Sequence, residues 1–98
     1  MVRRIIWSEK AKIVFQEILA FYYKRNGTKT YSKKLNSEIK KLISLLKKQA
    51  FIGRLTDIDN VRVLIKDNFK IFYKIEQNRI VILLVWDCRQ DPNDLKIA

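Results

Sequence analysis

VRVLIKDNFKIFYKIEQNRIVILLVWDCRQDP, residues 61–92, carries three strand signals in succession, separated by short polar turns. The alternation within residues 69–75 puts four apolar side chains on one face: Phe69, Ile71, Tyr73 and Ile75. A period of two is typical of a strand that has one face in the core. Residues 61–66 alternate in the same way, and Asp67-Asn68 supplies residues that tolerate left-handed turn geometry. We therefore predict strands over 61–66 and 69–75.

The third segment of this stretch, residues 80–86, is apolar at every position and rich in β-branched residues. Such a pattern favours a central strand with both faces covered. A buried helix is the alternative, but seven residues are short for a helix, and the flanking Gln77-Asn78 and Asp87-Cys88 pairs are turn-prone or polar. We expect three strands joined as an antiparallel meander.

Upstream of the meander, residues 2–7 form a short apolar run that can add a further strand to the sheet. Ser8 is a favoured N-cap, and Glu9 places negative charge near the positive end of a helix dipole. The predicted helix has an apolar stripe formed by Ala11, Phe15, Ile18 and Tyr22 and widened by Val14 and Phe21. The pair Asn26-Gly27 ends it, because glycine adopts the left-handed C-terminal conformation without steric cost.

A second helix is expected to begin at Thr28 or Thr30, either of which can act as N-cap. Its apolar stripe is Leu35, Ile39, Leu42 and Leu46, reinforced by Ile43 and Leu45. Residues 49–60 lack periodicity and are predicted to be a loop. The fold class is therefore α+β: an N-terminal strand, an antiparallel helical hairpin and a three-stranded meander in one sheet. One sheet face packs on the hairpin, and the other is expected to be concave and exposed.

Composition limits the chain to one domain, residues 1–98, since 98 residues with 48% hydrophobic content make one core. The single cysteine, Cys88, excludes an internal disulfide framework, and no signal-peptide pattern is present. The longest apolar run, residues 80–86, is far below the roughly 20 residues of a membrane span. We expect a cytoplasmic protein that has no membrane partner.

Positive charge is the strongest compositional signal: 21 Lys and Arg against 10 Asp and Glu give a net charge of +11. That balance favours nucleic acid or an acidic protein as partner. On the second helix, only Glu38 opposes a set of six lysines: Lys33, Lys34, Lys40, Lys41, Lys47 and Lys48. This surface either contacts phosphates or is an ordinary solvated helix face.

Several kinds of site are excluded. The chain has no histidine, which removes a histidine-based triad, a histidine general base and the common zinc sites. Gly27 and Gly53 are its only glycines, so there is no glycine-rich phosphate loop. Asp57 and Asp59 lie in the predicted loop and do not form a convincing catalytic pair. Capping is the favoured role of the carboxylates around the last turn, Asp87, Asp91 and Asp94. We expect no metal and no cofactor.

The remaining candidates are cationic and belong to the meander. Arg62 and Lys70 are expected to project from the sheet face that the helices leave uncovered, where they can hold a phosphodiester and stabilise its charged transition state. Arg89 offers a planar fork for a carboxylate or phosphate, although Asp87 can instead hold that fork in an internal salt bridge. The candidates for binding a target or partner are Arg62, Lys66, Lys70, Asp87, Arg89 and Gln90, and those for a nuclease are Arg62, Lys70 and Arg89.

Four segments, in this order and spacing, resemble the RelE/ParE superfamily of bacterial type II toxins, especially its ParE-like branch: IIWSEKAK (5–12), VRVL (61–64), NFKIFYKI (68–75) and ILLVWDCRQDPNDL (82–95). The last strand of that branch often runs into a D-x-RQ-x-P sequence. The resemblance implies a toxin that a cognate antitoxin holds inactive. It also implies that the antitoxin is acidic or of mixed charge and binds operator DNA through its other domain.

The resemblance leaves two possible targets, because the two branches of the superfamily act on different ones. RelE-like members cut messenger RNA in the ribosome, whereas ParE-like members act on DNA gyrase. The nuclease members resemble one another in basic sheet residues and a C-terminal tyrosine, but the residues after Arg89 include no tyrosine, and Tyr73 is predicted to lie in the core or at its rim. A gyrase-directed, non-enzymatic inhibitor is therefore favoured. A ribosome-dependent nuclease and a basic nucleic-acid-binding module without toxicity remain alternatives.

Overall fold

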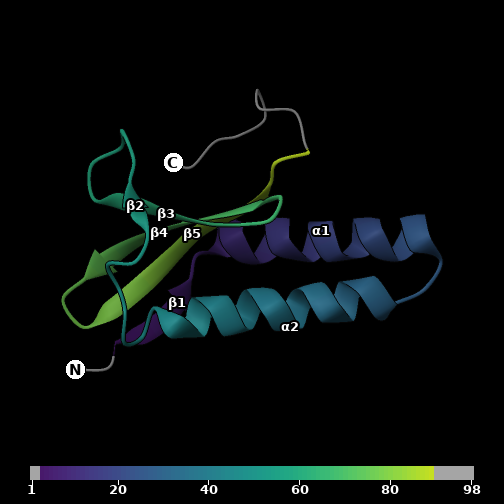
Figure 1. The fold of residues 1–98 in the computed structure, drawn as a ribbon, viewed down its shortest axis with the longest axis horizontal. Coiled ribbons are helices and arrows are strands. Elements are labelled where there is room, and N and C mark those ends of the chain that lie inside the picture. The colour runs from purple at the N-terminus through teal and green to yellow at the C-terminus, as the bar shows by residue number, and fades with distance from the viewer. Residues whose placement is uncertain (1–2, 90–98) are drawn as a thin grey trace.

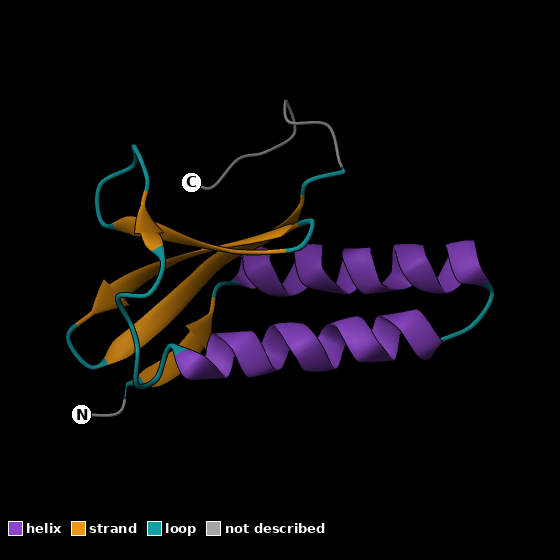
Figure 2. Cartoon of the chain, viewed as in Figure 1, coloured by secondary structure: helices purple, strands orange, loops and turns teal. Residues whose placement is uncertain are grey.

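The computed structural model describes residues 3–89, which form a helical hairpin packed on one five-stranded sheet (Figure 1). The elements in chain order are β1 (Arg4–Trp7), α1 (Glu9–Asn26), α2 (Thr30–Leu45), β2 (Arg54–Leu55), β3 (Val61–Lys66), β4 (Phe69–Glu76) and β5 (Arg79–Asp87). The strand order is β1-β5-β4-β3-β2, with β1 parallel to β5 and the other pairs antiparallel. Both helices lie on the same side of the sheet (Figure 2). The predicted α+β class and the three-stranded meander are confirmed.

Helix α1 begins and ends where the sequence predicts. The Ser8 hydroxyl accepts a hydrogen bond from the backbone N–H of Ala11 at 3.0 Å and donates one to the carbonyl of Leu83 at 3.1 Å. Gly27 ends the helix with a φ of 71°, and its N–H donates to the carbonyl of Tyr23. The Ser8 hydroxyl therefore does two things: it caps α1, and through Leu83 it connects the start of this helix to strand β5.

The start of α2 differs from the prediction. Lys29 occupies the N-cap position without a side-chain cap bond, so neither Thr28 nor Thr30 caps the helix. The connection is so short that Thr30 is already its first helical residue. Near its start, α2 is linked to α1 by Ser32, whose hydroxyl donates to the carbonyl of Leu19 at 2.7 Å.

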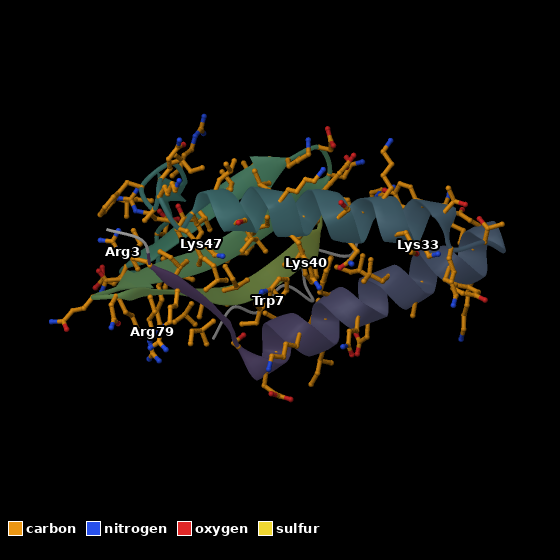
Figure 3. All side chains as sticks on the ribbon, turned by 90° about the horizontal axis from the view of Figure 1, so that it is seen from below. Arg3, Trp7, Lys33, Lys40, Lys47 and Arg79 are labelled. Carbon is orange, nitrogen blue, oxygen red and sulfur yellow. The ribbon has the colours of Figure 1, made fainter. Side chains whose placement is uncertain are left out.

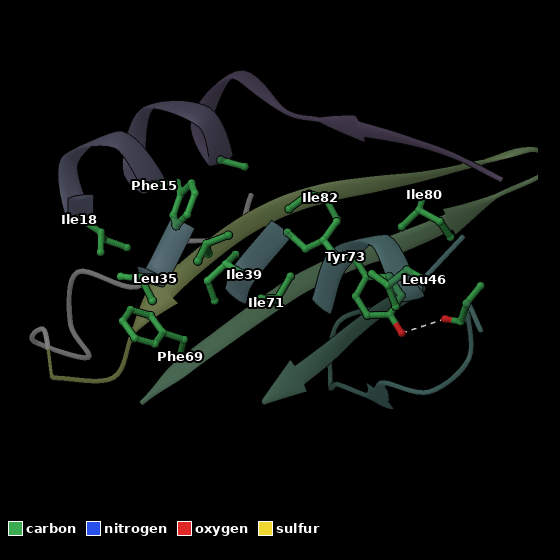
Figure 4. Packing of buried hydrophobic residues seen from close by; sticks show 14 of the residues in the cluster. Phe15, Ile18, Leu35, Ile39, Leu46, Phe69, Ile71, Tyr73, Ile80 and Ile82 are labelled. Carbon is green, nitrogen blue, oxygen red and sulfur yellow. Dashed lines mark hydrogen bonds between the residues drawn. The ribbon is translucent and has the colours of Figure 1, made fainter. Parts of the chain in front are cut away.

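The main core lies between the hairpin and the sheet face that carries Phe69, Ile71 and Tyr73, which we call the hairpin face (Figure 4). The predicted stripes of both helices supply its helical side. Phe21 and Leu45 are exceptions, being 50% and 49% exposed. Each lies one residue from a buried stripe position, and about 100° of helical rotation turns it out of the core.

The opposite sheet face, which we call the second face, carries a smaller cluster of buried side chains: Val61, Phe72, Leu84 and Trp86. The expectation of an exposed second face is therefore wrong for β4 and β5. The reason is visible in β5, whose apolar residues point alternately to both sides of the sheet. The prediction of a central strand covered on both faces holds, since β5 lies between β1 and β4 and supplies buried residues to the clusters on both faces.

Residues 49–60, predicted to be an irregular loop, include the two-residue edge strand β2. The Tyr73 hydroxyl fixes this segment, because it accepts from the N–H of Gly53 at 2.9 Å. It also donates to the carbonyl of Ala50 at 2.8 Å, the bond drawn in Figure 4. A Cβ atom at Gly53 would lie 2.5 Å from that hydroxyl oxygen, so the close approach requires glycine. Tyr73 is fully buried, as predicted. Between residues 3 and 89, neither helix is long and apolar enough to cross a lipid bilayer.

Candidate functional site

Asp87, the last residue of β5, is the centre of a polar cluster beside α1. The residue is buried, with 4% of its surface exposed. The Tyr22 hydroxyl donates to Oδ2 at 2.5 Å, the Arg89 backbone N–H donates to Oδ1 at 2.9 Å, and the Arg89 guanidinium donates from Nε to Oδ1 at 3.1 Å and from Nη2 to Oδ2 at 3.2 Å. Each carboxylate oxygen thus accepts two hydrogen bonds, which fills its lone-pair capacity.

The electrostatics of this cluster follow from its burial and its bonds. Burial alone would raise the pKa of Asp87, but the hydrogen bonds from Arg89 and Tyr22 outweigh it and hold that pKa below its usual value. Burial, and then the hydrogen bond to Asp87, raise the pKa of Tyr22. The bond to Asp87 raises the pKa of Arg89 above its already high value. At neutral pH the cluster is therefore an ion pair with a neutral tyrosine.

Aromatic rings complete the environment of Arg89. The guanidinium carbon lies 4.8 Å from the centroid of the Tyr22 ring and 5.7 Å from that of Phe69, within the range of a cation–π contact. The side chain of Arg89 is still 41% exposed. The structure thus forms the internal salt bridge with Asp87, while a role for Arg89 in binding a target stays a prediction. Gln90 lies outside the described residues.

Arg62 does not project from the second face, contrary to the prediction. It pairs across the sheet with Tyr73, so it lies on the hairpin face. Its guanidinium donates to the carbonyl of Gly53 at 2.7 Å and stacks 5.0 Å from the ring centroid of Phe51. The physical reason is strand alternation: Val61 belongs to the cluster on the second face, which turns the next residue to the other side.

The other two cationic candidates lie on different faces. Lys66 pairs with Phe69 across the sheet and is therefore on the hairpin face, where it lies 3.9 Å from Asp67. Lys70 pairs with Trp86 and lies on the second face. Thus Lys70, as predicted, is on the face away from the helices, but it is not accompanied there by Arg62.

The three nuclease candidates consequently do not form one site. Arg62 is tied to the segment around β2, Lys70 lies on the opposite face, and Arg89 is paired at the end of β5. The described part of the chain also brings together no group of three or more cysteine, aspartate or glutamate side chains that could hold a metal ion. Within residues 3–89, the three cations therefore lie at separate points and do not converge on one place.

Sequence reasoning missed two contributors, Tyr22 and Phe51. Tyr22 fits the apolar stripe of α1, and its hydroxyl group is the only sign in the sequence that it needs a polar partner. That partner, Asp87, is 65 residues away in the chain. Phe51 is 63% exposed and has the guanidinium groups of Arg3 and Arg62 within 5.8 and 5.0 Å of its ring centroid. A phenylalanine in an aperiodic segment gave no signal for this arrangement.

Residues 5–92 match the family model for the ParE toxin of type II toxin–antitoxin systems, ParDE. The chain belongs to the ParE toxin family. A solved structure described as a chromosomal ParDE toxin–antitoxin system from P. aeruginosa is similar, with a TM-score of 0.76 and 20% sequence identity over 88% of this chain and 96% of that chain. At that identity the likeness shows a common fold. A search of curated proteins found no match.

The extent of the ParE match bears on the site. It includes Tyr22, Asp87 and Arg89, so the polar cluster lies within the ParE domain. It also includes both helices and all the strands, apart from the first residue of β1. Both the cluster and the hairpin are therefore parts of the domain that defines the family.

Proposed function

We propose that this ParE-family chain is the toxin of a type II toxin–antitoxin module and arrests growth as a non-enzymatic inhibitor of DNA gyrase in the cytoplasm. A cognate antitoxin holds it inactive and contacts operator DNA through a domain of its own. Family membership and the net charge of +11, which suits an acidic partner, support the module.

The separation of the basic candidates is the main reason for preferring a non-enzymatic inhibitor to a nuclease. A nuclease without a metal needs several cations converging on one phosphodiester, because the charge that develops in the transition state is local. Here Arg62 and Lys70 lie on opposite sheet faces, and Arg89 is already neutralised by Asp87.

The two buried tyrosines, Tyr73 in the sheet and Tyr22 on α1, give the same preference. The Tyr73 hydroxyl is bonded to the segment around β2, and the Tyr22 hydroxyl to Asp87, and burial raises the pKa of both. Neither is free to exchange a proton with a substrate near neutral pH. The chain also has no histidine and no tyrosine after Arg89, so neither of these can serve as the general acid or base.

Two purified assays test the proposal. With gyrase, ATP and relaxed plasmid, the chain should block supercoiling, and addition of the antitoxin should restore it. With translating ribosomes, messenger RNA should remain uncut. Full supercoiling in molar excess of the chain would refute the gyrase target, and cleavage of ribosome-bound message would favour the RelE-like alternative.

Substitutions connect these assays to the candidate residues. If message is cut and Arg62→Ala or Arg89→Ala abolishes cutting, the nuclease assignment replaces ours. Lys74→Ala is the matched control, because it removes a cation of the same sheet that already pairs with Glu76 at 3.2 Å. Binding to nucleic acid without growth arrest would instead favour a basic binding module.

A further inference from the structure

We propose that an exposed aromatic platform beside β2 binds single-stranded nucleic acid, with a nucleobase stacked on Phe51 and the neighbouring phosphates held by Arg3 and Arg62. The platform belongs to the end of the molecule where the segment around β2 projects from the sheet, away from the turn that joins α1 to α2 (Figure 1). The inference goes beyond the gyrase proposal and does not depend on which enzyme the toxin inhibits.

Phe51 is the centre of the platform. It lies between α2 and β2 and, at 63% exposure, is the most exposed of the five phenylalanines of the chain. Two guanidinium groups lie over its ring: the guanidinium carbon of Arg62 is 5.0 Å from the ring centroid, and that of Arg3 is 5.8 Å from it. Any nucleobase can stack on an exposed aromatic ring, and a guanidinium group binds a phosphate through two parallel hydrogen bonds. Both kinds of contact are therefore available at one place.

Arg62 is held in position by the chain itself. Its Nη1 atom donates to the carbonyl of Gly53 at 2.7 Å and to that of Phe51 at 3.4 Å. Both acceptors belong to the segment that the Tyr73 hydroxyl anchors. No carboxylate among residues 3–89 forms an ion pair with Arg62. The guanidinium group is therefore oriented by neutral carbonyls, and its charge is not neutralised before an anion binds.

Arg3 supplies the second cation of the platform. Its backbone N–H donates to the carbonyl of Lys47 at 3.2 Å, and Figure 3 shows these two residues close together at one end of the molecule. The Nε atom of Arg3 is buried and has no hydrogen-bond partner within the described chain. A buried donor without a partner is unfavourable, so an acceptor that reaches Nε gains free energy there. This unsatisfied donor favours an anionic ligand beside Phe51.

The edge strand β2 extends the platform with a second exposed apolar side chain. Leu55 pairs across the sheet with Arg62, so the two side chains lie on the same face, and Leu55 is 67% exposed. Apolar and cationic groups therefore alternate along this edge in the order Phe51, Arg62, Leu55. A single strand of nucleic acid likewise offers bases for apolar contact and phosphates for cations.

A single strand fits this surface better than a duplex or an acidic peptide does. The ring of Phe51 and the two guanidinium groups are planar, and each can stack on an unpaired base while the guanidinium edges bind phosphates. In a duplex the faces of the bases are already stacked on one another. The carboxylates of an acidic peptide would use only the guanidinium edges and leave the ring facing water. We therefore assign the platform to unpaired nucleotides.

The acidic residues of the same segment limit the path of the strand. Asp57 and Asp59 lie in the turn between β2 and β3, where they repel phosphates. Lys47 lies at the other end of the segment, next to Arg3. We therefore expect the phosphates to run from Phe51 towards Arg3 and Lys47 and not over that turn.

Fluorescence anisotropy with labelled oligothymidine and oligouridine of about 10 nucleotides tests the stacking contact, and a DNA duplex of the same length is the control ligand. Phe51→Ala should weaken binding to the single strands by about fivefold or more and leave binding to the duplex unchanged within about twofold, because only unpaired bases stack on the ring. Phe51→Leu keeps an apolar side chain but no ring, so it should weaken binding to a similar extent. The matched control is Phe21→Ala on α1, which removes another exposed ring and should change binding by less than about twofold.

The salt dependence of binding tests the two arginines. Arg3→Gln and Arg62→Gln should each reduce the slope of log K against log salt concentration by about 0.7, the value for one phosphate contact to a single strand. Arg25→Gln is the matched control, because it removes the same charge in the last turn of α1 and should leave the slope unchanged. Arg62→Lys keeps the charge and should keep the slope. Circular dichroism melts verify that every variant folds.

Three results would overturn the proposal. The first is unchanged binding of both single strands by folded Phe51→Ala. The second is an equal change of slope in the Arg3, Arg62 and Arg25 variants, which would reduce the effect to net charge. The third is full affinity in Phe51→Leu together with displacement of the strand by a glutamate-rich peptide, which would make the platform a protein-binding surface.

Binding of either oligonucleotide that depends on Phe51 supports the proposal, and the one bound more tightly identifies DNA or RNA as the natural ligand. Supercoiling by gyrase is measured separately, so either proposal can fail without the other.

Discussion

Replacement of Asp87 by alanine is the sharpest test of the cluster at the end of β5. The change removes the acceptor of the buried Tyr22 hydroxyl and the partner of the Arg89 guanidinium. A buried hydroxyl without a partner costs about 1–3 kcal/mol. The ion pair adds only about 1 kcal/mol, because the Arg89 side chain is 41% exposed and its charge is screened. We expect a loss of about 2–4 kcal/mol, a large part of the stability of a small domain.

Urea unfolding followed by circular dichroism at neutral pH measures this loss. Tyr22→Phe should cost about 1 kcal/mol, because Asp87 keeps its three bonds from Arg89. Arg89→Ala should cost no more than about 1 kcal/mol, since the backbone N–H at this position still donates to Asp87. The double variant Tyr22→Phe/Asp87→Ala should lose less than the sum of the single losses, because both changes remove the same hydrogen bond.

An unfolding free energy for Asp87→Ala within about 0.5 kcal/mol of the unsubstituted chain would refute the reasoning, because that is the usual effect of a surface change. A growth assay then separates the two roles of Arg89. If Arg89→Ala and Arg89→Lys both lose toxicity at full folded yield, the guanidinium fork acts on the target. If toxicity falls only with folded protein, its role is the internal salt bridge.

Three further predictions concern other contacts and pH. Gly53→Ala should destabilise by about 1–3 kcal/mol in urea melts, since the new Cβ would lie 2.5 Å from the Tyr73 hydroxyl oxygen and 2.9 Å from the Val63 carbonyl oxygen. Tyr73→Phe should not restore the stability of the double variant, because the Val63 carbonyl and the ring atom Cε1 of residue 73, at 2.8 Å, stay in place. Ser32→Ala should cost about 1 kcal/mol by removing the bond to Leu19 across the hairpin. As a control, replacing an exposed threonine by valine, which exchanges a hydroxyl for a methyl group, should cost less. Because the folded-state pKa of Asp87 is depressed, the stability it provides is complete above about pH 5 and is lost as the pH falls further. The stability difference from Asp87→Asn should therefore shrink on acidification, and a constant difference down to about pH 3 would contradict the shift.

Elements of the fold could be predicted because their signals are local. The alternation in residues 61–75, the apolar run at 80–86, and the Ser8 and Gly27 caps each depend on neighbours a few residues away. The two-residue strand β2 was missed for the same reason. Its pairing with β3 and its anchoring by Tyr73 are tertiary contacts, which leave no pattern in residues 49–60.

The candidate site was less predictable, since it depends on which face each strand residue occupies. Assigning Val61 to the main core would place Arg62 with Lys70, but the second face has a buried cluster of its own, and Val61 belongs to it. With apolar residues on both faces of the meander, alternation fixes which residues share a face but not which face meets the helices. The bond between Tyr22 and Asp87 joins residues 65 positions apart, beyond any sequence pattern.

The division of charge between the two layers suggests how one small domain separates stability from recognition. Four ion pairs, Lys66–Asp67, Lys74–Glu76, Arg79–Glu76 and Arg89–Asp87, fall within residues 66–89, so much of the acidic charge of the meander is occupied internally. Lys33, Lys40 and Lys47 have no acidic partner among residues 3–89. Replacing these lysines therefore changes the surface charge of the hairpin without breaking an internal ion pair, whereas a change at Glu76 or Asp87 breaks at least one, and at Asp87 it also removes the bond that fixes the end of β5 to α1.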